Sequence, residues 1–304
     1  MNASEMKVLQ APVKVALKRI LIATDFSPVS QRALWHGLAI ARNVGASVDI
    51  VHIVDSLGFR MTGAEVVAQA VDLAEQDLKK MEAALLRSGP LNSIPHQMLV
   101  EEESGEVWEA LCRLVRDHDI DLVVLGTHGR TGLKKLFLGS VAEEVFRRSP
   151  CPVLTVGPHV ATDLDVRPPQ HILFPTGLSP ESLQALPFAF WAAEKCDAGL
   201  TLLHVVGRMS GGVKGDYERV FKKTRRQLES LAQDATLEKY PACVVAEGDF
   251  PGAVLNYANA HQIDLIILGL RSPEPYAERL VWQYAYEIVC QARSPVLTLR
   301  SAPL

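Results

Sequence analysis

The sequence has no uninterrupted apolar run of the length that a membrane-spanning helix needs. Its first twenty residues carry scattered lysines and no continuous apolar core, so we expect neither a signal peptide nor a stop-transfer segment there. These absences predict a cytoplasmic protein with no membrane partner.

Cysteine pairs, metal-ligand clusters and an excess of positive charge are absent as well. The chain has five cysteines, an odd number, and no C-x-x-C, which argues against a disulfide framework and against a zinc knuckle. No set of His, Asp and Glu has metal-ligand spacing, so we predict no metal site of the protein's own. The formal net charge of −4 gives no sign of a nucleic-acid partner.

An internal repeat is the dominant feature of the 304 residues. RILIATDFS at 19–27 matches HILFPTGLS at 171–179, and IDLVVLG at 120–126 matches IDLIILG at 263–269. The offset is 152 residues in the early part and 143 in the late part, so the second copy has lost residues from its middle. Duplication predicts two domains, at residues 15–158 and 170–301. The proline-containing segment 159–169 is the expected linker.

Each copy alternates short apolar runs with helical patterns. In the first copy we expect strands at ILIAT, VDIVHIV, HQMLVE, DLVVLG and PVLTV, and helices from Ser27-Pro28 to Gly45 and over 64–87, 105–117 and 140–148. Such alternation implies right-handed crossovers and a parallel sheet covered on both faces. The predicted fold class is therefore α/β, with two tandem doubly wound domains. Ligands of such sheets bind beyond the C-terminal ends of the strands.

A glycine-rich pattern, G-x-x-G-x9-G-S, follows the fourth strand of the first copy. It consists of Gly126 and Gly129, then Gly139 and Ser140 at the start of a helix. Glycines allow close backbone approach, and the free N–H groups of a helix start favour an anion. The pattern is neither a Walker loop nor a G-x-G-x-x-G fingerprint. Its spacing predicts a loop that holds phosphates.

Some members of this loop allow a second interpretation. Gly126 alone is as often a simple turn residue. His128 can touch phosphate or serve as a hydrogen-bonded turn histidine. Arg130, Lys134 and Lys135 could meet phosphate charge or lie in water.

The stretch LGTHGRTGLKKLFLGSVAEEVFRRSPCPVLTV resembles the C-terminal signature of the universal stress protein family, in its ATP-binding branch. ILIATDFSPVSQRAL resembles the family's first strand and helix, and VHIVD the end of its second strand. The resemblance covers both copies. It implies, for each domain, a five-stranded parallel sheet with helices on both faces, of the adenine nucleotide alpha hydrolase-like kind.

The resemblance also implies a site for ATP, with Mg²⁺ arriving on the nucleotide. Asp25, after Ala23 and Thr24, would lie near ribose and adenine, and the backbone at Ile53 would contact adenine. The phosphates would be held by the glycine loop and the helix start, which comprise Gly126, Thr127, His128, Gly129, Gly139, Ser140 and Val141.

The second copy lacks most of this site. By the offsets Asp25 becomes Gly177, Gly139 becomes Trp282 and Ser140 becomes Gln283, while Gly126 persists as Gly269. We therefore predict that the second copy has lost ordinary ATP binding and that Trp282 fills the space of a phosphate. Because the Ser-Pro helix start survives without the aspartate, we favour a ligand role for Asp25 over a helix-capping one. His52 and His204 both persist, which favours a structural histidine.

Three functions remain open from the sequence. The leading hypothesis is an ATP-binding module of the stress response, a signal or protective switch with one intact site. The second is slow ATP hydrolysis or autophosphorylation on Ser140, although no base is placed beside that serine, so we name no catalytic residue. The third is a nucleotide-independent interaction protein, with VLTV at 153–156 and VLTL at 296–299 as strands that could pair, within the chain or in a homodimer.

Overall fold

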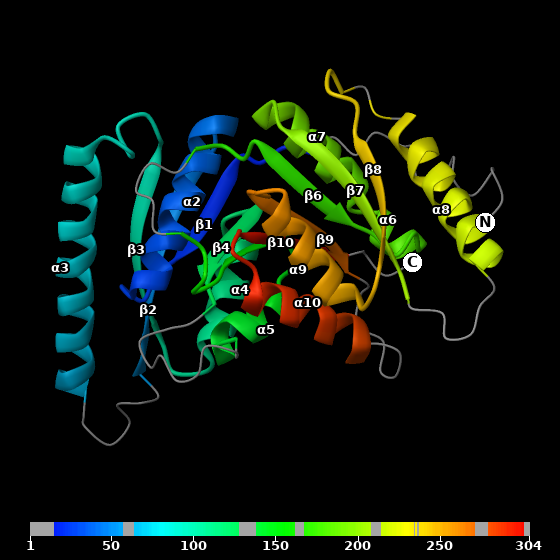
Figure 1. Cartoon of the computed structure of the whole chain (residues 1–304). Coiled ribbons are helices and arrows are strands. Elements are labelled where there is room, and N and C mark those ends of the chain that lie inside the picture. The colour runs from blue at the N-terminus through cyan, green and yellow to red at the C-terminus, as the bar shows by residue number, and fades with distance from the viewer. Residues whose placement is uncertain are drawn as a thin grey trace. The chain divides into compact units, whose positions relative to one another are not determined.

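The computed structural model describes residues 15–56, 64–127, 138–161, 167–207, 214–233, 235, 237–270 and 279–300. The chain divides into two compact units, an N-terminal unit at Ala16–Pro168 and a C-terminal unit from Pro169 onward (Figure 1). No helix among the described residues is long and apolar enough to cross a membrane.

The described residues of the N-terminal unit form five parallel strands in the order β3-β2-β1-β4-β5. The strands are β1 (Arg19–Ala23), β2 (Ser47–Asp55), β3 (His96–Glu103), β4 (Leu122–Gly126) and β5 (Val153–Val156). The helices are α2 (Pro28–Val44), α3 (Ala64–Ser88), α4 (Val107–Asp117) and α5 (Ser140–Arg148). With right-handed crossovers, α2 and α3 cover one face of the sheet, and α4 and α5 cover the other.

This order places the change of winding direction between β1 and β4. Chain connections leave β1 toward β2 on one side and return to β4 on the other, so a crevice opens at the C-terminal ends of these two strands. The strands are buried on both faces, and Ile20, Leu21 and Ile22 in β1 have no exposed surface. The doubly wound fold with helices on both faces is thus confirmed.

The local signals for α2 are also confirmed. Ser27 is its N-cap and accepts a hydrogen bond from the Ser30 N–H at 3.2 Å, and Pro28 occupies the first turn, where a missing N–H costs nothing. Gly45 ends the helix with φ of 72°, a left-handed conformation that glycine adopts without strain.

The C-terminal unit repeats the plan, with strand order β10-β9-β6-β7-β8. Its strands are β6 (His171–Pro175), β7 (Gly199–Val206), β8 (Ala242–Glu247), β9 (Leu265–Leu270) and β10 (Val296–Arg300). Its helices are α6 (Pro180–Leu183), α7 (Leu186–Cys196), α8 (Lys214–Gln233), α9 (Phe250–Ala260) and α10 (Arg279–Gln291).

The duplication extends to single hydrogen bonds. Asp121 accepts from the backbone N–H groups of Lys18 and Arg19 at 2.7 and 3.0 Å. At the matching position, Asp264 accepts from those of Gln170 and His171, both at 2.9 Å. Each carboxylate ties the start of the first strand of its unit to the start of the fourth.

The first helix of the repeat differs between the units. The N-terminal unit has the continuous α2, whereas the C-terminal unit has α6 and α7, separated at Gln184 and Ala185. Pro187 stands where Trp35 stands in α2. Proline cannot donate to the carbonyl of Leu183, and its ring crowds that carbonyl, which accounts for the break.

Candidate functional site

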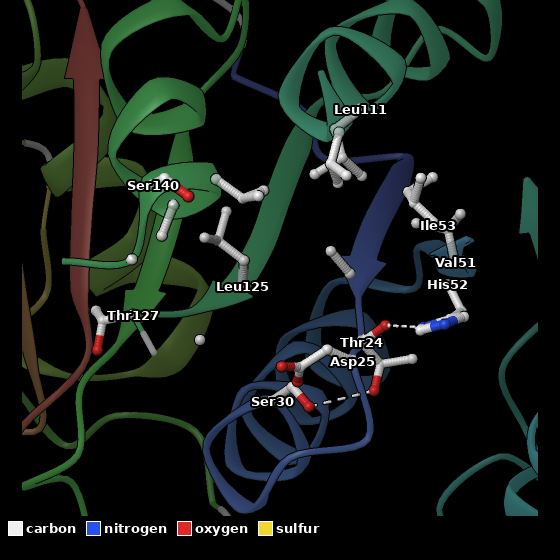
Figure 2. A pocket seen from close by; sticks show the side chains of 16 residues that line it. Thr24, Asp25, Ser30, Val51, His52, Ile53, Leu111, Leu125, Thr127 and Ser140 are labelled. Atoms are coloured by element: carbon white, nitrogen blue, oxygen red, sulfur yellow. Dashed lines mark hydrogen bonds between the residues drawn. The ribbon is translucent and has the colours of Figure 1, made fainter. Parts of the chain in front are cut away.

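A cavity of about 290 Å³ lies at the C-terminal ends of β1, β2 and β4 in the N-terminal unit (Figure 2). This volume is close to the lower end of the range for small-molecule sites. Its lining residues are Ala23, Thr24, Asp25, Ser30, Val51, His52, Ile53, Val107, Leu111, Leu125, Gly126, Thr127, Gly139, Ser140, Val141 and Ala142. The cavity therefore lies at the crevice that the strand order defines.

Nine of the eleven residues named as site candidates from the sequence line this one cavity. The other two, His128 and Gly129, lie outside the described residues, as do Arg130, Lys134 and Lys135. The nine come from segments far apart in the chain, the ends of β1, β2 and β4 and the start of α5.

The start of α5 supplies unpaired backbone donors. Gly139 is the N-cap and no side chain caps the helix; the first helical bond runs from the Glu143 N–H to the Gly139 carbonyl at 2.8 Å. The N–H groups of Ser140, Val141 and Ala142 thus have no acceptor within the helix, and all three residues line the cavity. Together with the helix dipole they form a positive region that suits an anion.

The position of this helix start is fixed by the end of β4. The Gly139 N–H donates to the carbonyl of Thr127 at 2.7 Å, and the Thr127 N–H donates to the carbonyl of Val156 at 3.0 Å. Thr127 is fully buried. The backbone of Gly139 has φ of −62° and ψ of 150°, a conformation open to any residue, so conformational freedom does not account for this glycine.

Asp25 lies at the end of β1, opposite this helix start. Its Oδ1 accepts a hydrogen bond from the Ser27 N–H at 3.0 Å. Burial acts to raise the pKa of Asp25, but hydrogen bonds from Ser27 and Ser30 outweigh it, so the pKa lies below its ordinary value. Asp25 is therefore a carboxylate at neutral pH and can accept hydrogen bonds from a ligand.

A hydrogen-bonded network holds the end of the first strand in each unit, β1 in one and β6 in the other. The Phe26 N–H donates to Thr24 Oγ1 at 3.1 Å, as the Leu178 N–H does to Thr176 Oγ1 at 3.0 Å. Both Phe26 and Leu178 have left-handed backbones, with φ of 63° and 59°. The C-terminal unit keeps this network with Gly177 in place of Asp25, so the scaffold does not depend on the aspartate.

Gly126 is required by packing. A Cβ atom there would lie 3.0 Å from the Ser30 backbone nitrogen and from a Val29 methyl group. At Gly269, its counterpart, a Cβ atom would lie 2.4 Å from the Ser182 carbonyl oxygen. Both glycines let the helix after the first strand approach the fourth strand closely, which explains why Gly269 persists in the second copy.

Sequence reasoning found only part of the apolar side of the cavity: it named Ile53 but not Val51, Val107 or Leu111. Val51 and Ile53 come from β2, and Val107 and Leu111 come from the first turns of α4. Figure 2 shows Ile53 and Leu111 facing the cavity from these separate elements. The available signal was topological, because α4 starts near the C-terminal edge of β3, on the side of the sheet where ligands bind.

The matching helix of the C-terminal unit begins earlier than the offset of 143 predicts. By that offset α5 would map onto residues 283–291, but α10 starts at Arg279, one turn before. Trp282 and Gln283 therefore lie in the helix body, where N–H groups bond to carbonyls of the preceding turn. Backbone donors equivalent to those at Ser140 and Val141 are not free there.

No group of three His, Cys, Asp or Glu side chains among the described residues could hold a metal ion. The five cysteines, all among the described residues, are not joined by disulfides. The fold and its cavity define a tandem α/β protein with a cavity at the switch point of its N-terminal sheet.

Comparison with known proteins assigns the family. The model of the universal stress protein family matches residues 16–157 and 169–300, so the chain belongs to that family, as a tandem member. A universal stress protein of Methanocaldococcus jannaschii is 34% identical over 144 residues, 46% of this chain and 81% of that protein. A universal stress protein A homolog of Coxiella burnetii is 32% identical over 144 residues, 46% of this chain and 95% of that protein.

A solved structure shares the whole fold. A universal stress protein from Archaeoglobus fulgidus superposes with a TM-score of 0.68 at 17% identity, covering 93% of this chain and 98% of that one. At this identity the similarity concerns the fold alone.

Proposed function

We propose that the protein binds ATP, carried with Mg²⁺, in the N-terminal unit and acts as a signalling or protective module of the stress response. The observation that carries the proposal is the joint lining of one cavity by the free N–H groups of α5, by the Asp25 carboxylate and by an apolar wall. A nucleotide presents the three matching chemistries: phosphates, ribose hydroxyls and a flat base.

In this proposal the phosphates lie at the start of α5. Three N–H groups and the helix dipole receive their charge. Because the backbone of Gly139 needs no glycine for its own conformation, we infer that a side chain there would obstruct the phosphates. Asp25 accepts from the ribose hydroxyls, and the base lies along Val51, Ile53, Val107 and Leu111.

The proposal is one of binding rather than turnover. Asp25 and His52 are the titratable side chains among the described lining residues. Asp25 is held by Ser27, and His52 Nδ1 lies 2.7 Å from the Thr24 carbonyl oxygen. Neither is hydrogen-bonded to Ser140 in the described part of the chain, so no observation favours a hydrolytic nucleophile there.

Isothermal titration of the purified chain with ATP and Mg²⁺ tests the proposal. We expect saturable binding of ATP, and we expect ADP to compete with it more strongly than GTP does. Since one universal stress protein structure was solved in complex with cAMP, that nucleotide is included as a competitor. Absence of binding by any adenine nucleotide would refute the proposal.

A Gly139→Trp variant places an indole at the start of α5, where the phosphates are proposed to bind, and so locates the site. We expect loss of ATP binding with an unchanged circular dichroism spectrum. Ser93→Trp, in the turn between α3 and β3, is the matched control for the added indole. Equal ATP affinity of the Gly139→Trp variant and the wild type would show that the phosphates bind elsewhere.

A further inference from the structure

The exposed face of α8 carries a row of positive side chains, Arg219, Lys222, Lys223 and Arg226, which we call the basic stripe. All four side chains are exposed, whereas Thr224 and Leu228 on the opposite side of the helix are buried. The spacing of i, i+3, i+4 and i+7 puts the four on one face of the helix, over about 10 Å of its length. In Figure 1, α8 lies along β8 at the edge of its unit.

The stripe lines a shallow hollow of its own. The hollow has a volume of about 460 Å³, and Gln227 and Ser230 are its other described lining residues. A continuous positive surface therefore passes into a neutral hydrogen-bonding one along the same helix face.

The charges of the stripe are not neutralised within the described part of the chain. The ion pair found on α8 joins Arg225 to Glu229, 3.0 Å apart, and leaves out the four members of the stripe. Glu218 is four residues before Lys222, yet no ion pair between them occurs among the described residues. Four cations that share a face without partners repel one another, which costs stability unless a ligand compensates.

The equivalent helix of the N-terminal unit provides a comparison. Two buried positions of α3 and α8 coincide when Ala74 is placed over Thr224 and Leu78 over Leu228. The stripe positions then correspond to Gln69, Asp72, Leu73 and Gln76. The α3 helix has three basic and five acidic residues, and α8 has six basic and three acidic ones. The fold does not require this positive face, since its own duplicate lacks it.

We propose that the basic stripe is a docking surface for an acidic peptide segment of a partner protein. An extended polyanion, such as nucleic acid or an anionic membrane, would face a chain with a net charge of −4 around this narrow stripe. A short extended acidic segment matches the stripe, because about three residues in extended conformation span its length of about 10 Å. Its peptide groups would meet Gln227 and Ser230, which hydrogen-bond without needing charge. This surface belongs to the unit that lacks the intact nucleotide motif.

Fluorescence anisotropy with a short fluorescein-labelled glutamate-rich peptide and the full chain tests this proposal. The variant Arg219→Gln/Lys222→Gln/Lys223→Gln/Arg226→Gln should bind about tenfold or more weakly. Binding by the wild type should weaken between low and high salt, because exposed charges are screened. The control Arg42→Gln/Lys79→Gln/Lys80→Gln/Arg147→Gln removes the same charge from other exposed sites and should bind as the wild type does.

Further variants and ligands test which class of partner binds the basic stripe. The variant Arg219→Lys/Arg226→Lys keeps the charge and should retain binding; if the fourfold variant fails to fold, Lys222→Gln/Lys223→Gln takes its place. Equal weakening in the control, or tighter binding to an oligothymidylate or to phosphatidylglycerol vesicles than to the peptide, would overturn the proposal. Light scattering that shows a dimer for the wild type and the control, but a monomer for the fourfold stripe variant, would also overturn the proposal. The occupant of the stripe would then be a second copy of the chain.

Discussion

His52 Nδ1 lies 2.7 Å from the carbonyl oxygen of Thr24, and this bond joins the end of β2 to the end of β1 at the wall of the cavity. The same bond joins His204 to Thr176 at 2.8 Å in the C-terminal unit, where the glycine loop is lost. A contact that persists without the ligand motif belongs to the scaffold. The histidine therefore holds two strand ends together and thereby positions Asp25 and Ile53.

The first prediction follows from this pair of bonds. His52→Ala and His204→Ala should each destabilise the protein by a similar amount, about 1–2 kcal/mol, because each leaves a carbonyl without its partner. Urea unfolding monitored by circular dichroism measures this. If His52 served chemistry instead, His52→Ala would leave stability unchanged.

The second prediction separates ligand binding from folding at Asp25. Asp25→Asn should lower the affinity for ATP about tenfold, since a hydrogen bond to a charged acceptor is lost. Its thermal stability should change little, because the C-terminal unit holds the same network with Gly177. Ser182→Ala, in the matching network of the other unit, should leave ATP affinity unchanged. A fall in thermal stability without a fall in affinity would assign Asp25 to the scaffold.

The third prediction concerns the two packing glycines. Gly126→Ala and Gly269→Ala should each destabilise the chain by about 1–3 kcal/mol, the usual cost of overpacking. Gly269→Ala should cost more, since its Cβ would lie 2.4 Å from a carbonyl oxygen rather than 3.0 Å from a backbone nitrogen. Denaturant titration provides the values. A neutral Gly269→Ala would refute the packing argument.

The fourth prediction is a pH dependence from His36 in α2. Burial, with a smaller effect of Arg32, lowers its pKa to about 4. The folded state therefore favours neutral imidazole: the stability is complete above the unfolded pKa of about 6.5 and falls as the pH drops toward 4. The loss by pH 4 is on the order of 3 kcal/mol. His36→Gln should flatten this part of the stability curve. Parallel curves for wild type and His36→Gln would contradict the prediction.

Much of the fold could be predicted because apolar runs, the Ser27-Pro28 cap and Gly45 are local signals, each confirmed by the structure. The repeat extended them to the second copy. The break before Pro187 could have been predicted too, because proline is a local helix breaker. The earlier start of α10 could not, because it departs from the offset of 143 that the flanking strands give.

Most, but not all, of the residues that line the cavity could be named from the sequence. The ends of β1 and β2 were named from the resemblance to the universal stress protein family, and the end of β4 from its glycine pattern; topology indicated the same edge of the sheet. Val107 and Leu111 were not, because their place in the cavity depends on how α4 packs on β2 and β3. The pattern around Gly126 indicated the region where the cavity lies, but the reason for that glycine is the close approach of α2, which only the structure shows.

The central claim is that a duplicated fold carries a single adenine-nucleotide site. Native mass spectrometry of the intact chain with ATP and Mg²⁺ counts bound nucleotides directly. The account predicts one ATP per chain for the wild type and none for Gly139→Trp. Two ATP molecules per chain, or one that remains bound to Gly139→Trp, would contradict it.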